Sequence, residues 1–418
     1  MKFQMVNSVL TIIFDSIGTM TLAAVLLLLG FWVKKKVAFL EKFCIPAPVV
    51  GGFIFVFLNY LFYLSGVIIF KFDSTYMAAF MLAFFTSVGL GTNLKILITG
   101  GKLLVVYWLV NVVITILQTG IGVYVSPMVG MHAVYGIVSG PVALVGGHGG
   151  AAAYGQTLEA MGFPGASLVG LTAATFGLIV ASLVGGPFGR RLVEAYDLKP
   201  TEDDGEEPIL DLAGYEAVET KEELDYADTM KNITAVLVAM TLGSFIVNVI
   251  SGFIPPIGGK PFGIPAYVGA MFVAVILRNL NEKFKFYHFS REFNDNLGDV
   301  CLGIYLSMAL VTLKLWELAG LAGPLLIVLT MQTIFLLLIT YFIVFRILGK
   351  NYDAAVMCSG LIGHDIGSTP TAVANMTTIM DKYGPSRKAL IIVPIVGAFL
   401  IDVFYQPFVV YCINVFAR

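Results

Sequence analysis

The sequence contains little charge: only 12% of its 418 residues are Asp, Glu, Lys or Arg, against about 25% in an average soluble domain. Hydrophobic residues make up 58% of the chain, and apolar runs of about 20 residues recur along it. This combination excludes a soluble protein and indicates helices that cross a membrane. The net charge of −2 leaves no basic surface stripe, so nucleic acid is excluded as a partner.

Cysteine is also scarce. Four cysteines are present, Cys44, Cys301, Cys358 and Cys412, and none forms a C-x-x-C pair, so neither a disulfide framework nor a zinc site is expected. His148, His364 and Asp365 lack the spacing of zinc ligands. The chain has no P-loop and no G-x-S-x-G motif. We therefore expect no enzyme and no cofactor, and we predict that an ion gradient supplies the energy for function.

Ten apolar segments predict ten transmembrane helices in two sets of five. The segments are 9–33, 46–64, 76–91, 103–125 and 168–187, followed by 233–253, 266–280, 302–318, 324–348 and 389–416. Each set also holds a stretch rich in Gly, Ser, Thr and Ala, at 135–160 and 355–379. Broken backbone at membrane depth is tolerated only where protein or a watery cavity satisfies its polar groups, so both stretches are interpreted as re-entrant hairpins. Alternatively, the small residues only allow close helix packing.

The polar residues divide the chain into two halves. An acidic linker, 192–230, separates an amino-terminal half, 1–191, from a carboxy-terminal half, 231–418. With both termini outside and the linker in the cytoplasm, most of the 25 Lys and Arg residues lie on the cytoplasmic side, as the positive-inside rule requires. The sequence therefore predicts this orientation.

An internal repeat relates the halves. Ile45-Pro46-Ala47 recurs as Ile264-Pro265-Ala266, 219 residues later, and Ser139-Gly140 recurs as Ser359-Gly360. Because each half has an odd number of spans, the two copies are predicted to have opposite orientations. We therefore predict an all-α polytopic membrane protein of two inverted repeats, an arrangement typical of secondary transporters.

Candidate binding residues lie in the two hairpins and the last span. The first hairpin contains Gly147, His148, Gly149 and Gly150, whose backbone N–H groups can approach an anion closely. In the second, Thr369 is interpreted as a helix N-cap followed by Pro370, with Ser368 and Thr371 beside it. Asp402 interrupts the last apolar run, where a carboxylate is costly and usually functional. It could bind sodium, carry a proton or pair with a substrate ammonium; a structural carboxylate is the alternative.

Several strings, in order along the chain, carry a resemblance to a known family. They include Ile45-Pro46-Ala47-Pro48-Val49-Val50-Gly51-Gly52, Gly146-Gly147-His148-Gly149, Ala174-Thr175-Phe176-Gly177-Leu178, Thr369-Pro370-Thr371-Ala372 and Val393-Pro394-Ile395-Val396-Gly397-Ala398-Phe399. On these strings the sequence resembles the bacterial sodium/glutamate symporters. The resemblance implies ten spans in an inverted repeat, a homodimer in the inner membrane, and sodium-coupled uptake of glutamate by an elevator-like movement.

Under the leading hypothesis the hairpin N–H groups and the Ser368, Thr369 and Thr371 hydroxyls hold carboxylates, while Asp402 holds the ammonium. Sodium is then bound by Asn93, Gly147, Asn375 and Asp402. Two departures from the family pattern lie near this site: residues 360–365 replace a more glycine-rich stretch, and Gly150 replaces a threonine. Two alternatives remain: a sodium-coupled symporter of a dicarboxylate or 2-hydroxycarboxylate, and a membrane-embedded hydrolase that uses Asp365 and Asp402.

Overall fold

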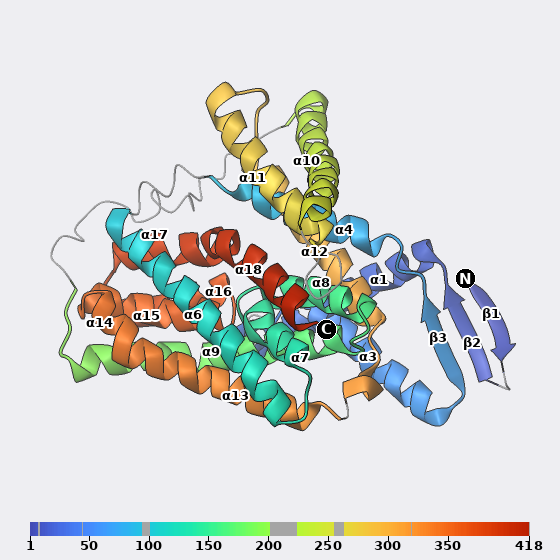
Figure 1. Cartoon of the computed structure of the whole chain (residues 1–418), viewed down its shortest axis with the longest axis horizontal. Coiled ribbons are helices and arrows are strands. Elements are labelled where there is room, and N and C mark those ends of the chain that lie inside the picture. The colour runs from blue at the N-terminus through green and yellow to red at the C-terminus, as the bar shows by residue number, and fades with distance from the viewer. Residues whose placement is uncertain are drawn as a thin grey trace.

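Helices account for most of the computed structural model, which describes residues 1–6, 9–43, 45–93, 101–200, 224–254, 263–318 and 320–417 (Figure 1). The helices of the first half are α1 (Ser16–Lys36), α2 (Ala38–Lys42), α3 (Ala47–Ser65), α4 (Met77–Gly91), α6 (Gly101–Met128), α7 (Ala133–Ile137), the π-helix η1 (Val138–Val142), α8 (Gly147–Ala160) and α9 (Ala166–Ala195). Those of the second half are α10 (Tyr226–Phe253), α11 (Ala266–Phe284), α12 (Arg291–Val311), the 3₁₀ helix η3 (Leu315–Leu318), α13 (Ala322–Ile339), the π-helix η4 (Thr340–Val344), α14 (Phe345–Ile347), α15 (Tyr352–Asp365), α16 (Thr369–Tyr383), α17 (Arg387–Ile395), the π-helix η5 (Val396–Leu400) and α18 (Ile401–Phe416).

Seven helices in the described part of the chain are long and apolar enough to cross a membrane. They are Ser16–Lys36, Ala47–Ser65, Gly101–Met128, Ala166–Ala195, Tyr226–Phe253, Ala322–Ile347 and Arg387–Phe416. Each overlaps one of the ten predicted spans, which supports a multi-pass membrane protein. The predicted span 302–318 is displaced: α12 begins at Arg291, where Ser290 caps it by accepting a hydrogen bond from the Phe293 amide at 3.2 Å, and it ends at Val311.

A small sheet precedes the first long helix and corrects the prediction of an all-α fold. Strand β1 (Lys2–Val6) pairs antiparallel with β2 (Val9–Phe14), which pairs parallel with β3 (Ile68–Phe72). The first span therefore begins at Ser16 rather than Val9, because the Asp15 carboxylate caps α1 by accepting a hydrogen bond from the Gly18 amide at 2.7 Å. Residues 9–14 are as apolar as the helix that follows, so hydropathy alone could not separate the strand from the helix.

The helix boundaries repeat between the halves. Helices α3 and α11 are both 19 residues long, begin 219 residues apart, and follow prolines with a φ of −62°. The last span is 30 residues long in both halves, at Ala166–Ala195 and Arg387–Phe416. In each half a helical hairpin lies between the last two long spans. The element order thus agrees with the predicted internal repeat, while the inverted orientation stays a prediction.

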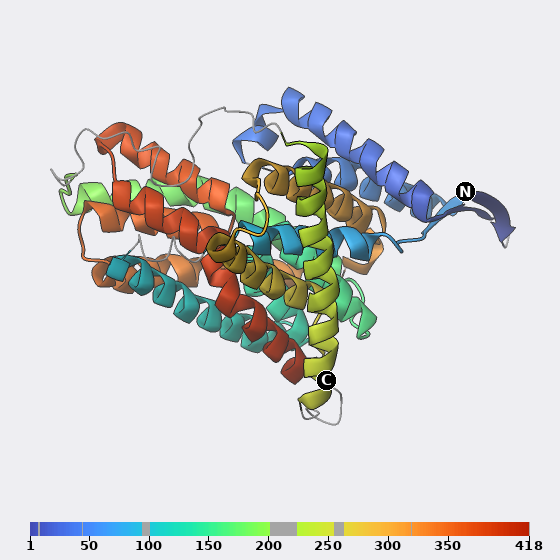
Figure 2. The same ribbon diagram turned by 90° about the horizontal axis from the view of Figure 1, so that it is seen from above.

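The helices pack as two groups, and both halves contribute to each. The frame group consists of α1, α3, α4, α10, α11 and α12, which pack mainly against one another. The hairpin group consists of α6–α9 and α13–α18. In Figures 1 and 2 the teal and green helices of residues 101–195 lie among the orange and red helices of residues 322–416, while α1 and the sheet lie at the other end.

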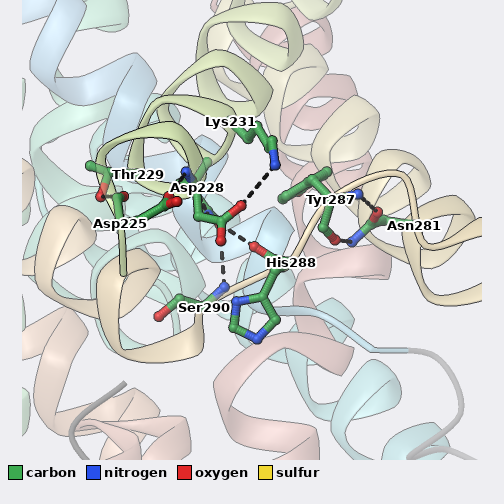
Figure 3. Close-up of polar contacts among 9 residues, drawn as sticks. Asp225, Asp228, Thr229, Lys231, Asn281, Tyr287, His288 and Ser290 are labelled. Atoms are coloured by element: carbon green, nitrogen blue, oxygen red, sulfur yellow. Dashed lines mark hydrogen bonds and ion pairs between the residues drawn. The ribbon is translucent and has the colours of Figure 1, made fainter. Parts of the chain in front are cut away.

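Segments predicted to be cytoplasmic lie together. At the start of α10, Asn232 Nδ2 donates to the His288 carbonyl at 2.9 Å, which joins α10 to the turn between α11 and α12 (Figure 3). At the end of α9, Glu194 accepts a hydrogen bond from Tyr383 at 2.7 Å, after the second hairpin. The predicted linker 192–230 is helical at both ends, because α9 continues to Ala195 and α10 begins at Tyr226. Residues 201–223 lie outside the described part of the chain.

Candidate functional site

Both predicted hairpins are pairs of helices with a break between them. In the first, η1 and α8 are separated by residues 143–146, and in the second, α15 and α16 are separated by residues 366–368. The helical parts run from 133 to 160 and from 352 to 383, close to the predicted 135–160 and 355–379. The glycine and hydroxyl-rich composition therefore located the helix pairs correctly.

The two breaks meet at the middle of α9. A methyl group on Gly177 would lie 2.0 Å from the Ile366 carbonyl oxygen and 3.1 Å from Leu144 Cδ2. Only glycine permits this approach, because any Cβ atom would overlap the backbone of the second hairpin. Two helix breaks from different halves thus meet at a long apolar helix, the arrangement in which membrane proteins expose backbone groups to a ligand.

The first break is held by both helix groups. Gly147, the first residue of α8, has a φ of +59°, which favours glycine. His148 is buried, and its Nε2 lies 2.9 Å from the Thr175 hydroxyl of α9. The Gly149 carbonyl accepts a hydrogen bond from Tyr305 of α12 at 3.3 Å, and a methyl group on Gly150 would lie 3.0 Å from the Val142 carbonyl.

The second break is capped by hydroxyl groups. Ser368 is the N-cap of α16, with Thr369 as the first helical residue and Pro370 as the second, so the predicted cap at Thr369 is wrong by one position. The Ser368 hydroxyl accepts a hydrogen bond from the Thr371 amide at 3.4 Å and lies 2.9 Å from the Thr371 hydroxyl. Further along α16, the Asn375 amide donates to the Ala181 carbonyl of α9 at 3.1 Å.

Comparison with known proteins adds to this geometry. The family model for sodium/glutamate symporters matches residues 12–385. The sodium/glutamate symporter of Escherichia coli K12 is 36% identical over 392 residues, which cover 93% of this chain and 95% of the relative. That of Haemophilus influenzae is 38% identical with the same coverage.

The chain belongs to the sodium/glutamate symporter family. This confirms the resemblance and places the protein among transporters rather than enzymes. The two carboxylates of the hydrolase hypothesis also have different surroundings: Asp365 lies beside His364, and Asp402 accepts a hydrogen bond from Gln406 at 3.3 Å. The hydrolase is therefore not considered further.

In this member of the symporter family, Asp402 belongs to a chain of polar contacts with the first hairpin. Gln406, which donates to Asp402, accepts a hydrogen bond from Tyr154 of α8 at 2.5 Å. Tyr154 packs edge-on against Tyr267 of the frame group at 5.4 Å between ring centroids. Asp402 is thus tied to the second arm of the first hairpin, whereas Ser368, Thr369 and Thr371 belong to the tip of the second.

Asn93 lies apart from the other predicted sodium ligands. Phe84 of α4 contacts Gly149, but the helix continues to Gly91, about 10 Å further along its axis, before Asn93 follows. The neighbouring Thr92 carbonyl accepts a hydrogen bond from Asn279 of α11 at 3.1 Å. The structure brings Gly147 and Asn375 to opposite ends of the same part of α9, and it leaves Asn93 at the far end of α4.

Cavities separate the two helix groups on the side predicted to be extracellular. The largest, about 760 Å³, is lined by Asn59, Lys71 and Trp316 near the frame group and by Gln156 and Glu159 of α8. A second cavity of about 520 Å³ is lined by Tyr154, Tyr267 and residues of α18. These cavities lie beside the second arm of the first hairpin, where a solute could enter between the groups.

Three side chains that contact the hairpins were not predicted as site residues: Thr175, Tyr305 and Tyr107. Thr175 precedes Gly177 in one of the family strings, which was the available signal. Tyr305 and Tyr107 lie inside long apolar helices and reach the hairpins only through packing of distant segments. No local pattern distinguishes them from ordinary buried tyrosines.

Proposed function

We propose that this protein is a sodium-coupled symporter that imports L-glutamate, or a closely related anionic amino acid, across the bacterial inner membrane. The observation that carries this proposal is family membership over residues 12–385. The meeting of two helix breaks at Gly177 supports it, because such breaks provide binding sites in secondary transporters. A dicarboxylate or 2-hydroxycarboxylate is the second candidate substrate, favoured by the replacement of a glycine-rich stretch at residues 360–365.

In the proposed scheme, helix N-termini and hydroxyl groups hold the anionic groups of the substrate. The substrate-binding residues are Gly147, His148, Gly149, Gly150, Ser368, Thr369, Thr371 and Asp402, with Asp402 pairing with the ammonium. The sodium ligands are Asn93, Gly147, Asn375 and Asp402. Backbone and carboxamide oxygens suit sodium, a hard cation, and the position of Asn93 requires α4 to approach the hairpins in another state.

The proposed architecture is two inverted repeats of five transmembrane helices, each with a re-entrant hairpin. In an elevator movement the hairpin group would carry the site past the frame group, and the cavities between the groups support such a boundary. We further propose a homodimer with both termini outside and the linker 192–230 in the cytoplasm. The broad lipid-accessible apolar surfaces of α1 and α10 agree with exposure to the bilayer or to a second copy.

Uptake into proteoliposomes tests this function. Labelled glutamate should accumulate when an inward sodium gradient is imposed, and replacing sodium with choline at constant pH should abolish the accumulation. Unlabelled amino acids and dicarboxylates, added as competitors, rank the substrates. Concentrative uptake in choline, driven by a pH gradient alone, would contradict sodium coupling.

A further inference from the structure

A fully buried carboxylate lies at the carboxyl end of α15, just before the second break. Asp365 has 0% exposure, and neither of its oxygens has a hydrogen-bond partner among the described residues. The nearest charged or titratable atom is His364 Nδ1, 3.0 Å from Oδ1. His364 is itself buried, and its Nε2 lies 2.8 Å from the Tyr107 hydroxyl of α6.

Nothing else around this pair supplies a compensating charge in the described part of the chain. Tyr107 of α6 interacts electrostatically with Asp365 and with Cys358 of α15, and these are the titratable neighbours. At this end of α15 the other packed elements contribute residues that do not titrate: Gly177 of α9 beside Ile366, Ala372 of α16 beside Gly363, and Gly397 of η5 beside His364. An ionised carboxylate is too costly in such surroundings without a proton or a bound cation.

The neighbouring atoms favour a proton over a metal ion. A sodium ion requires several oxygen ligands, whereas the closest polar atom to Asp365 is an imidazole nitrogen. The described residues contain no group of three or more His, Cys, Asp or Glu side chains that could hold a metal ion. With both ring nitrogens protonated, His364 would direct Nδ1–H toward Asp365 and Nε2–H toward the Tyr107 oxygen.

We propose that Tyr107, His364 and Asp365 form a proton-binding site that holds one proton while the second hairpin packs against α6. Taking that proton from water changes the charge of the cluster from −1 to zero, and releasing it to water restores −1. The next residue, Ile366, abuts Gly177, so loss of the proton places an uncompensated charge directly beside the second break. The packed state is therefore stable with the proton bound and becomes less stable as the pH rises.

Thermal unfolding of the purified full-length protein in detergent tests the site without any substrate. Between about pH 6 and about pH 9, the wild-type Tm should fall on the alkaline side. Asp365→Asn should remove this fall. Tyr107→Phe should move it to lower pH by about one to two units, because the protonated imidazole loses a hydrogen bond.

Asp353→Asn provides the matched control. Asp353 lies at the other end of α15 and is also buried, but it accepts hydrogen bonds from Ser386 at 2.7 Å and Lys388 at 3.3 Å. This variant should keep the alkaline fall at the wild-type pH. A general destabilisation of α15 would affect both variants alike, whereas the proposal requires only Asp365→Asn to change the pH dependence.

Three results would overturn the proposal. The first is an alkaline fall in Asp365→Asn at the wild-type pH. The second is a wild-type fall that disappears in saturating sodium together with a loss of sodium stabilisation in Asp365→Asn, which would assign the site to sodium instead. If Asp365→Asn does not fold, Tyr107→Phe decides, and an unshifted fall in that variant would reject the cluster. Failure to transport glutamate has no bearing on these measurements.

Discussion

Gly177 determines how closely the two hairpins can approach α9. Its missing side chain leaves room for the Ile366 carbonyl, and a Cβ atom would stand 2.0 Å from that oxygen. Backbone cannot rotate away as a long side chain can, so the cost of a methyl group must appear as displacement of the second hairpin or of α9.

We therefore expect Gly177→Ala to lower the free energy of unfolding by about 1–3 kcal/mol and to abolish uptake. Gly120→Ala in α6 is the control, because nothing lies within 4 Å of its Cβ position and alanine favours helix. Thermal unfolding and glutamate uptake measured together distinguish the two. Wild-type uptake and stability in Gly177→Ala would mean that the close contact at α9 is not required.

Asp402 is the residue whose role divides the amino-acid and dicarboxylate substrates. Asp402→Asn keeps the size of the side chain and removes its charge. If Asp402 pairs with a substrate ammonium, the variant should lose about 2–5 kcal/mol of amino-acid affinity, roughly 30-fold to several thousand-fold, while substrate-free sodium binding changes little.

Titration calorimetry of sodium alone, and then of substrate in saturating sodium, separates these roles. If Asp402 binds sodium, the first titration should lose its signal. A Tyr154→Phe control removes only the hydroxyl that donates to Gln406 and leaves Asp402 charged. Unchanged sodium and substrate affinities in Asp402→Asn would identify a structural carboxylate.

At the level of helices and hairpins, composition predicted positions well and ends less well. Gly, Ser, Thr and Ala clusters located both hairpins, because few other sequences break a helix at membrane depth. The cap of α16 was missed by one residue, since Ser368 and Thr369 are both good N-caps and only tertiary packing selects between them. The strand 9–14 was missed because its partner, 68–72, is distant in sequence.

Single cysteines at the two breaks test whether the hairpins are re-entrant. In a background without native cysteines, Val145→Cys and Thr369→Cys should react with small aqueous thiol reagents, because both positions are only partly buried. The first should react preferentially from outside and the second from inside, and substrate with sodium should protect both.

A chain that keeps only Cys358 is the control for this labelling. Cys358 lies within the first arm of the second hairpin and has 0% exposure, so it should not react in the native state. Inertness of both engineered positions would favour closed, packed helices over re-entrant hairpins.

For the whole molecule, hydropathy and the repeat predicted the element order but not the packing. The repeat places equivalent elements 219 to 221 residues apart, and this spacing is visible in the sequence. The division into a frame group and a hairpin group depends on contacts between the two halves, such as α4 with α11 and α9 with α15. Apolar faces that meet lipid and apolar faces that meet another helix have the same composition, so no sequence pattern separates them.

An elevator movement requires the two groups to slide, and a cross-link between them should stop it. Gln156 of α8 donates to Met77 Sδ of α4 at 3.5 Å, across the boundary on the side predicted to be extracellular. After treatment with a short bifunctional thiol reagent, the pair Met77→Cys and Gln156→Cys should lose uptake, and cleavage of a reducible linker should restore it. The control pair, Tyr63→Cys and Trp316→Cys, joins side chains that stack 4.0 Å apart near the frame group, so its cross-link should leave uptake intact. Full uptake by the first pair when its cross-linking is complete would show that transport proceeds without relative movement at this boundary.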